Sequence, residues 1–326
     1  MNEEMKRLLK EGAELHLSGN FPEAEERYRQ ALELNQSSAV AHNNLAFLLM
    51  QLQRFGESEE EYFRAIELNK GYSTAYSNLG QLYLLMQRWD EAEEVLTKAI
   101  SLNADEFHAQ ESLAKLFMLK GESERSEYHW KRSYLINPES GILLNLAYSL
   151  IQQQKLDEAL QELNRALPQE EENPRLYSLL GIIHFATYDF GSAITCFKRS
   201  LGLEPEDAEV RHNLAMAYLK TGQTMDAIIE LRRILLLAPS HTDARNNLAV
   251  IELSAGEAES ALEHFTITLE QEPHNPKALY YTGVLMLQRG DVKLAKRMLL
   301  QTIESNHDDY KQKAVELLKS ISEVIP

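Results

Sequence analysis

The amino-acid sequence predicts an all-α protein built as a solenoid of nine helical hairpins. Three observations lead to this fold class. A small residue recurs at intervals of 34 residues, apolar side chains follow helical spacing, and the alternation typical of strands is absent. Dividing the 326 residues by this interval gives about 9.6, so repeats account for nearly the whole chain.

Three columns of residues define the repeat. A small marker residue is followed twelve residues later by Ala or Ser and sixteen residues later by a bulky apolar or aromatic residue. Seven of the eight marker intervals are 34 residues and one is 33. The markers are Gly12, Ala46, Gly80, Ala114, Ala147, Gly181, Ala215, Ala249 and Gly283. The bulky residues are Tyr28, Tyr62, Leu96, Trp130, Leu163, Phe197, Leu231, Phe265 and Leu299. The small residues let neighbouring helices approach, and the bulky residues fill the space between them.

Each repeat predicts a first helix, a tight turn, a second helix and a break. Seven residues after the marker stands a glycine in five repeats, where a left-handed residue would end the first helix. These glycines are Gly19, Gly121, Gly222, Gly256 and Gly290. Proline stands twenty-four residues after the marker in four repeats, at Pro138, Pro205, Pro239 and Pro273. In the segment RWDEAEEV we expect Asp90 to cap a second helix, with Glu93 reaching back to form a capping box.

These columns resemble the tetratricopeptide repeat family, whose 34-residue hairpin carries a small residue, an Ala, an aromatic and a Pro at these offsets. The resemblance implies a right-handed superhelix whose concave side is lined by the first helices. Ser58, Ser126 and Ser133 depart from it where Ala is usual, and Ile234 replaces a small residue. One solenoid is expected over 1–326, with units at about 5–38, 39–72, 73–106, 107–139, 140–173, 174–207, 208–241, 242–275 and 276–309.

Two segments lie outside the regular pattern. After the ninth unit, Tyr310, Ala314, Leu317, Leu318 and Ile321 form one helical stripe, so we expect a capping helix over 310–326 that covers the last repeat. An independent docking helix is the alternative. In ALPQEEENPRLY, Pro168 should end its helix early and Pro174 should open the next. A hinge near 168–174 and a slightly altered repeat angle within one rigid solenoid both fit this segment.

Composition disfavours several classes of function. Lys and Arg total 33 and Asp and Glu total 50, so the net charge of −17 disfavours binding to the nucleic-acid backbone. The sequence contains no stretch of 18 consecutive apolar residues, so we expect no direct insertion into a membrane. The N-terminus shows no secretory signal, so we expect a cytoplasmic protein; a periplasmic or secreted location would require that a signal peptide had been removed.

The sequence shows no catalytic motif. The ten histidines are scattered without metal-ligand spacing, and neither a Gly-rich phosphate loop nor a G-x-S-x-G elbow is present. The single cysteine, Cys196, lies in a second helix and is interpreted as a packing residue. We therefore expect no enzymatic activity, no cofactor and no metal site.

A column of asparagines marks the first helices. Asn is a poor helix former, yet it stands two residues before the marker in five repeats, with a neighbouring Asn in two of them. The column is Asn44, Asn78, Asn145, Asn213 and Asn247, and the neighbours are Asn43 and Asn246. Side-chain amides donate and accept hydrogen bonds, so such a column can hold the backbone of an extended peptide. The Asn-Leu pairs resemble the asparagine ladder of some tetratricopeptide repeat domains; the alternative is that Asn is simply common and exposed at this position.

Apolar residues beside this column complete the predicted site. Phe47, Tyr148 and Phe185 are expected at the groove, although packing between adjacent first helices also accounts for them. Some members of the family capture carboxylates with Lys, Asn and Arg; in the last three units only Asn247 and Lys277 match, so such capture has little support.

The function expected from these features is that of a scaffold or adaptor that binds a peptide or amphipathic helix of another protein in its groove. The alternative is a structural or regulatory subunit of an enzyme, envelope or motility assembly, which would use the convex face, an end or self-association.

Overall fold

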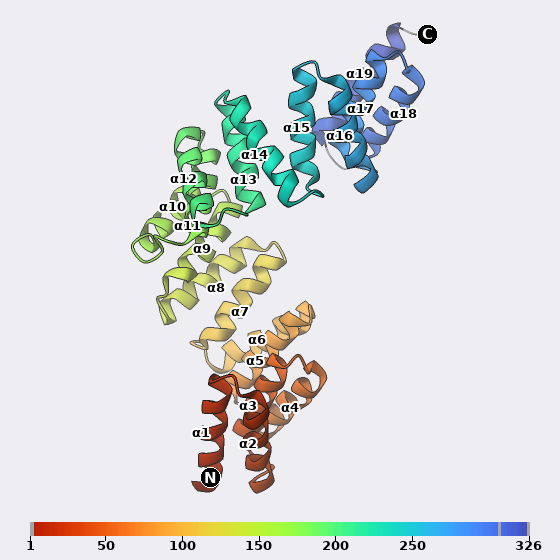
Figure 1. The fold of residues 1–326 in the computed structure, drawn as a ribbon. Helices are drawn as coiled ribbons and strands as arrows, with labels where there is room; N and C mark the ends of the chain where they lie inside the picture. Colours follow the sequence, from red (N-terminus) through yellow and green to blue (C-terminus); the bar gives the residue numbers. More distant parts are fainter. Residues whose placement is uncertain (1–2, 306–307, 325–326) are drawn as a thin grey trace. The chain divides into compact units, whose positions relative to one another are not determined.

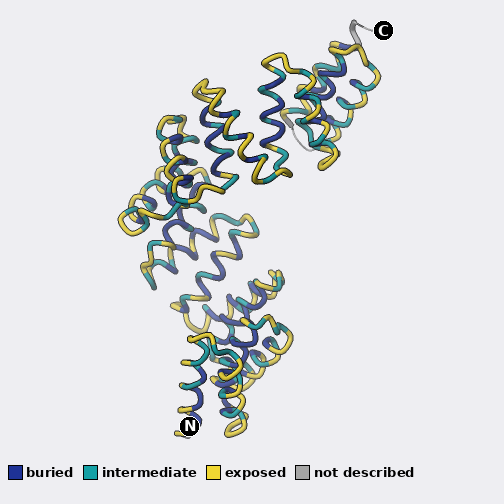
Figure 2. Tube along the Cα trace, viewed as in Figure 1, coloured by how far each residue is buried: buried dark blue, intermediate teal, exposed yellow. Residues whose placement is uncertain are grey.

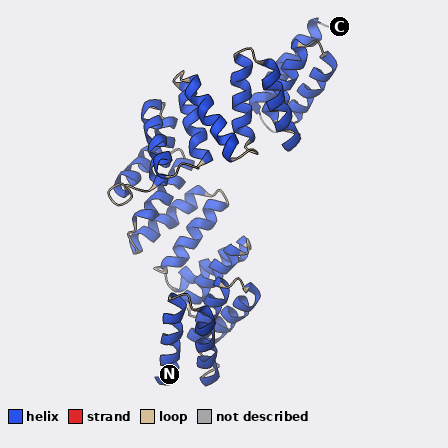
Figure 3. Cartoon of the chain, in the orientation of Figure 1, coloured by secondary structure: helices blue, strands red, loops and turns tan. Residues whose placement is uncertain are grey.

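The computed structural model describes residues 3–305 and 308–324. Within these ranges the chain forms nineteen α-helices and no strand, as Figures 1 and 3 show. Helices that follow each other in sequence pack against each other. The protein is therefore an all-α solenoid, and the predicted fold class is confirmed.

The helices alternate between first and second positions of successive hairpins. The first helices are α1 (Glu3–Leu17), α3 (Ala39–Gln51), α5 (Ser73–Leu85), α7 (Phe107–Leu119), α9 (Ser140–Gln152), α11 (Pro174–Ala186), α13 (Ala208–Lys220), α15 (Thr242–Ser254) and α17 (Pro276–Gln288). The second helices are α2 (Phe21–Leu34), α4 (Phe55–Leu68), α6 (Trp89–Leu102), α8 (Ser123–Ile136), α10 (Leu156–Ala166), α12 (Phe190–Leu203), α14 (Thr224–Leu237), α16 (Ala258–Gln271) and α18 (Val292–Glu304). The last helix is α19 (Asp308–Val324), which packs against α17 and α18. Residues 325 and 326 of the expected capping helix lie outside the described residues.

The chain divides into two compact units, Met1–Glu170 and Glu171–Pro326. The N-terminal unit holds α1 to α10 and the C-terminal unit holds α11 to α19. Helix α10 ends at Ala166, two residues before Pro168, because proline lacks the amide hydrogen that would continue the helix. A hinge at this segment stays a prediction.

Contacts between the marker residue and the bulky residue hold each hairpin together. In the third repeat a Cβ atom on Gly80 would lie 2.4 Å from the Leu96 side chain. The same construction on Gly181 gives 2.5 Å to the Phe197 ring. Both bulky side chains are fully buried. Because no Cβ atom fits at these distances, glycine is the residue that allows α5 to contact α6 and α11 to contact α12 this closely.

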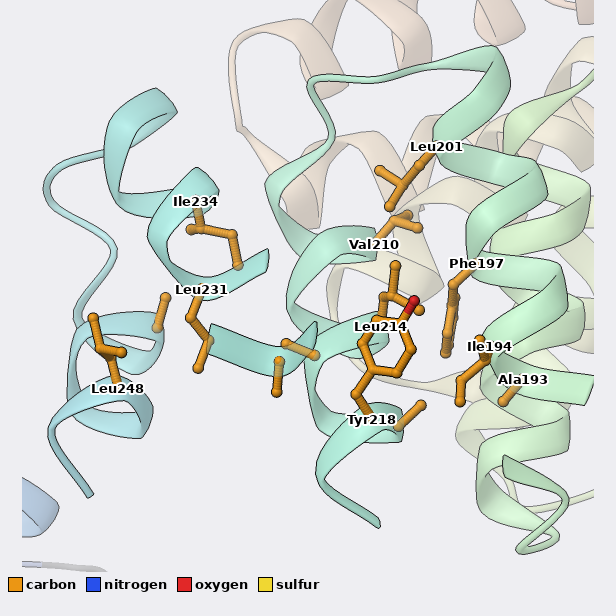
Figure 4. Packing of buried hydrophobic residues seen from close by; sticks show 14 residues of the cluster. Ala193, Ile194, Phe197, Leu201, Val210, Leu214, Tyr218, Leu231, Ile234 and Leu248 are labelled. Atoms are coloured by element: carbon orange, nitrogen blue, oxygen red, sulfur yellow. The ribbon is translucent and has the colours of Figure 1, made fainter. Parts of the chain in front are cut away.

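The next repeat completes the core of each hairpin. In the C-terminal unit, Ile194 and Phe197 of α12 share a buried cluster with Leu214 and Tyr218 of α13, as Figure 4 shows. The cluster continues through Leu231 of α14. Figure 2 shows that buried residues lie along the helices whereas the turns are largely exposed. A single hairpin would leave half of these side chains in water, so the stack is required for stability.

All nine turns that follow the first helices contain a left-handed residue. Five of them use the glycines predicted for this position, with φ between 75° and 86°. The other four use Gln53, Gln87, Gln154 and Tyr188, with φ between 57° and 64°. The prediction of a left-handed residue is confirmed, and the backbone geometry is the same whether or not the residue is glycine. The four non-glycine residues carry a steric penalty that glycine avoids.

The predicted capping box at Asp90 is wrong. Helix α6 begins at Trp89, its N-cap is Arg88, and no side chain caps it. The left-handed Gln87 reverses the chain early enough for the helix to start before Asp90. Asp90 instead accepts a hydrogen bond from Lys120 at 3.1 Å, and Glu93 accepts one from Arg125 at 2.7 Å. Both acidic residues therefore connect successive repeats.

A ladder of ion pairs joins the second helices of the N-terminal unit. The acidic members stand at equivalent positions of four second helices: Glu25–Arg54 at 2.8 Å, Glu59–Arg88 at 2.9 Å, Glu93–Arg125 at 2.7 Å and Glu127–Lys155 at 2.8 Å. Arg54, Arg88 and Lys155 are the N-cap residues of the next second helix, whereas Arg125 lies inside α8. In repeats five to eight the acidic position is occupied by Leu160, Ile194, Ile228 and Leu262, and in the ninth by Lys296. The acidic members of the ladder are thus confined to the first four repeats, which belong to the N-terminal unit.

Glu127 has the strongest electrostatic effect in this ladder. Burial alone would raise its pKa, but hydrogen bonds from Lys131, Lys155 and Gln153 outweigh that effect and lower the pKa to about 2. A carboxyl group whose pKa is lowered by folding stabilises the folded state above its unfolded value of 4.5. This stabilisation is lost as the pH falls from that value through the folded pKa.

The first prediction concerns the hairpin contact. Gly80→Ala is expected to lower the free energy of unfolding by about 1–3 kcal/mol, because the new Cβ atom would overlap with Leu96. Gly56→Ala is the control, since a Cβ atom there meets nothing within 4 Å. Thermal melting followed by circular dichroism compares the two. Equal melting temperatures for both variants would contradict the role assigned to the marker residue.

The second prediction concerns pH. Glu127→Gln is expected to reduce the loss of thermal stability on acidification from about pH 6 to about pH 3, because the depressed carboxyl pKa is removed. Glu124→Gln is the control, since this exposed residue of the same helix forms no ion pair among the described residues. Calorimetry at both pH values tests the difference. The idea fails if the two variants lose stability by the same amount as the unaltered protein.

Candidate peptide-binding groove

A groove of about 660 Å³ lies on the first-helix side of the N-terminal unit. Residues of α1, α3, α5 and α7 line it, together with Gly19, Phe21 and Tyr28 at one end. None of its lining residues is Asp, Glu, Lys or Arg, although 83 residues (33 + 50) of the chain are charged. The groove is therefore suited to an uncharged ligand.

Side-chain amides form a relay along one wall of this groove. The Asn78 Nδ2 atom donates to Asn43 Oδ1 at 3.0 Å, and Asn43 Nδ2 donates to Asn44 Oδ1 at 3.4 Å. Asn43 and Asn78 are buried, with 5% and 8% of their surface exposed. Asn44 is partly exposed, and its Nδ2 atom has no acceptor among the described residues. The relay therefore fixes the Asn44 side chain while leaving its N–H groups available to a ligand.

Aromatic rings from α1, α2 and α3 also line the groove. The ring of His16 lies 5.7 Å from that of Phe21 and 5.6 Å from that of Phe47, measured between centroids. The His16 Nε2 atom is also 2.8 Å from Gln51 Oε1, which joins α1 to α3. Tyr28 completes this set of rings, and its burial raises the pKa of its hydroxyl group. Phe47 both packs against a neighbouring first helix and lines the groove.

His16 is a groove residue that the sequence reasoning did not select. It stands four residues after the first marker, a position that is apolar in the other eight repeats. The polar residue at this otherwise apolar position was the signal by which the sequence could have identified His16. A ring with two polar nitrogens at an otherwise apolar position is expected where a side chain faces solvent or a ligand instead of the core.

The remaining predicted residues fall into different environments. Asn145 and Asn213 are partly exposed, and their side-chain amides have no hydrogen-bond partner among the described residues. Asn246 is fully buried and donates to Asn275 Oδ1 at 3.1 Å. A side chain without exposed surface cannot reach a peptide, so Asn246 is left out of the proposed contacts.

Tyr148 and Phe185 are both partly exposed. Tyr148 lines a smaller pocket of about 370 Å³ with Ser149 and Gln152. Phe185 packs edge-on against Phe190, with 5.2 Å between the ring centroids. Tyr148 is therefore placed to meet a ligand, whereas one edge of Phe185 is already covered by its own hairpin.

A second polar cluster lies on first helices of the C-terminal unit. The Asn247 Nδ2 atom is 2.8 Å from His212 Nε2, and the Lys277 ammonium group donates to Asn247 Oδ1. Burial lowers the pKa of Lys277 and that of His212. Within residues 3–305 and 309–321, no carboxylate forms an ion pair with Lys277. The Nδ2 and Oδ1 atoms of Asn247 therefore both have partners within the protein.

Two searches for other kinds of site gave negative results. Among the side chains that the structure describes, no group of three or more His, Cys, Asp or Glu residues could hold a metal ion. In the same part of the chain, no helix combines the length and apolar character needed to cross a membrane.

Comparison with protein families identifies the class of protein. Models described as "Tetratricopeptide repeat" match residues 37–105, 77–141 and 252–321, and one described as "TPR repeat" matches residues 12–53. A model described as "Tetratricopeptide repeat protein 21 C-terminal ARM domain" matches residues 118–253. The chain belongs to the tetratricopeptide repeat family, whose fold is typically a non-catalytic scaffold and commonly mediates protein–protein interactions.

Solved structures share this fold. A chain of the APC/C hetero-tetramer Cut9-Hcn1 aligns with a TM-score of 0.60 and 19% identity over 89% of this protein, which spans 55% of that chain. PilF of Pseudomonas aeruginosa aligns with a TM-score of 0.58 and 21% identity, covering 64% of this protein and 96% of PilF.

The human IFIT1 dimer with m7Gppp-AAAA aligns with a TM-score of 0.59 and 16% identity, covering 96% of this protein and 80% of that chain. No curated protein matches the sequence. At these identities the similarities show the fold alone.

The third prediction separates the asparagines of the groove by their roles. Asn78→Ala is expected to lower the free energy of unfolding by about 1–2 kcal/mol, because it leaves the buried Asn43 Oδ1 atom without its donor. Asn44→Ala is expected to change it by less than about 0.5 kcal/mol, because the hydrogen bond from Asn43 to Asn44 is long at 3.4 Å and water can replace it at this partly exposed position. Chemical denaturation measures both. The relay would be refuted by equal losses in the two variants.

Proposed function

We propose that the protein is a non-catalytic scaffold that binds an extended, uncharged segment of a partner protein in the groove of its N-terminal unit. The observation that carries this proposal is the composition of the groove. It combines an amide relay that ends in a free donor with aromatic rings, and it contains no charged residue. These are the two kinds of contact that a peptide backbone and an apolar side chain require.

The asparagine amides of the groove favour an extended peptide over a helix as the ligand. Backbone N–H and C=O groups of a bound helix already pair with each other, so they would leave the Asn44 donors without a partner. An extended peptide exposes those groups to the groove. Packed helices lie about 8–10 Å apart, and an extended chain rises about 3.3 Å per residue, so one repeat corresponds to about three peptide residues.

The aromatic side supplies an anchor for the peptide. His16, Phe21 and Phe47 together present ring faces and edges against which an aliphatic or aromatic side chain would pack. Asp or Glu in the peptide would lose hydration without gaining a cationic partner, since no Lys or Arg lines the groove. Recognition would therefore select apolar and small polar sequences.

Further contacts are proposed along the same column of first helices. The amides of Asn145 and Asn213 are unpaired within the described residues and partly exposed, and Tyr148 lies close in sequence to the first of them. Asn145 and Tyr148 would add contacts within the N-terminal unit, and Asn213 would be a separate contact of the C-terminal unit. Asn247 is a weaker candidate, because Lys277 and His212 already occupy its amide.

The fourth prediction tests this function with a selected peptide. A displayed library of nine-residue peptides is selected against the full chain, and the dissociation constant of the best binder is measured by calorimetry. Asn44→Ala combined with Phe47→Ala is expected to weaken binding at least about tenfold, or about 1.4 kcal/mol. Asn145→Ala combined with Asn213→Ala is expected to leave thermal melting nearly unchanged. It is expected to weaken binding only for a longer segment that reaches either residue, because nine extended residues span only about three repeats.

Asn164→Ala serves as the matched control, because this exposed Asn lies on the second helix α10. A selection that yields only strongly charged peptides, or an affinity that neither double variant alters, would refute the proposed groove. The alternative role, as a structural or regulatory subunit that binds through the second helices, an end or self-association, predicts that both groove variants leave partner binding unchanged.

A further inference from the structure

The outer side of α14 carries a stripe of apolar residues that the packing of the repeats does not use. Met225, Ile229 and Leu236 are 70%, 51% and 81% exposed. Their spacing of four and seven residues places them along one face of the helix. The opposite face contributes Ala227, Leu231 and Ile234, all fully buried in the core of the C-terminal unit, where Figure 4 shows the latter two.

Comparison with the other repeats shows that this stripe is not a requirement of the fold. At the same three positions of the next second helix, α16, the chain carries Glu259, Glu263 and Glu270. In α2 the last two of these positions are Glu26 and Glu33. Helix α8 also exposes Tyr128 and Leu135 at the last two positions, but it carries Glu124 at the first. Among the second helices, α14 alone places a large apolar side chain at all three, which is unfavourable unless another surface covers them.

The charges beside the stripe identify the kind of surface that fits. Asp226 and Arg233 lie seven residues apart on the same side of the stripe, with Ile229 between them. Asp226 forms no ion pair among the described residues, and the Arg233 guanidinium lies 4.0 Å from Glu230, at the limit of an ion pair. The exposed Arg232 lies next to Arg233 and also faces this side. The order along this face is therefore apolar, acidic, apolar, basic and apolar, with two arginines at the basic step. Such an order is self-complementary when a second identical helix runs antiparallel to the first.

We propose that α14 forms the centre of a two-fold symmetric interface with α14 of a second copy of this chain. With the axis near Ile229, the two isoleucines pack against each other. Asp226 of each copy lies opposite Arg233 of the other when the axis passes midway between positions 229 and 230, because both residues are then equally far from it. Leu236 then covers the turn at Gly222, where no side chain obstructs it. The same patch on both copies makes the interface isologous.

This interface is independent of the proposed groove, which belongs to the N-terminal unit. It would bring two copies of the groove into one particle, so that a partner with two binding segments would gain avidity. One helix pair buries less than the 1,200 Å² or so that a stable dimer requires, so the dimer forms weakly and depends on concentration.

Sedimentation equilibrium of the full chain over a range of concentrations up to about 1 mM tests the proposal. The unaltered protein is expected to show a reversible monomer–dimer equilibrium. Ile229→Glu is expected to raise the dimer dissociation constant at least tenfold. Gln161→Glu is the matched control, because it introduces the same charge at the same position of α10. Circular dichroism establishes that each variant remains folded.

A charge exchange tests the symmetry of the interface. Asp226→Arg and Arg233→Glu are each expected to weaken the dimer, because each brings like charges together across the axis. The double variant Asp226→Arg/Arg233→Glu is expected to restore it, because the pairs form again with reversed sign. A monomer at every concentration, a dimer insensitive to Ile229→Glu, or a double variant weaker than both single variants would each overturn the proposal. Peptide binding to the groove is measured separately and does not depend on this outcome.

Discussion

The contact between a small residue on each first helix and a bulky residue on the following second helix is the interaction on which the rest of the structure depends. Where the small residue is Gly80 or Gly181, the partner side chain occupies the place of the missing Cβ atom. This contact fixes the distance between the two helices of a hairpin. It also decides which side of each helix faces outward and which meets the next repeat, and so it positions both the groove and the outer face of α14.

The two compact units combine this shared core with different outer contacts. In the N-terminal unit, Glu59–Arg88 and three equivalent ion pairs connect successive second helices. In the C-terminal unit the corresponding position carries Ile194, Ile228, Leu262 or Lys296, and no acidic residue. Burial of apolar surface is not weakened by electrostatic screening, whereas partly exposed ion pairs are. The stability of the N-terminal unit is therefore expected to depend more strongly on ionic strength.

The net charge of −17 has a more limited meaning once its location is known. Acidic residues cluster on second helices, and several of them pair with basic residues of the next repeat, as Glu25 does with Arg54. The groove carries none of this charge. The charge balance therefore describes the exterior of the protein and gives little information about its partner.

The asparagine column shows what can be predicted from the sequence and what cannot. Its spacing correctly indicated that these residues share the first-helix side. It did not separate Asn44, which keeps free donors, from Asn43 and Asn78, which pair with each other across two repeats. The capping box at Asp90 failed for a related reason, since the turn conformation at Gln87 and the cation of Lys120 in the next repeat determine what that carboxylate contacts.

The sequence by itself determined the repeat, the helix positions and the turns, because these follow from periodicity and from contacts between residues sixteen positions apart. Helix-forming stretches ended by a left-handed residue can be recognised from residue type and spacing alone. Only the tertiary structure decided which polar side chains form hydrogen bonds within the protein and which keep donors or acceptors available to a ligand. That outcome depends on partners about 35 residues away, as for Asn43 and Asn78, whose distance depends on how successive repeats pack.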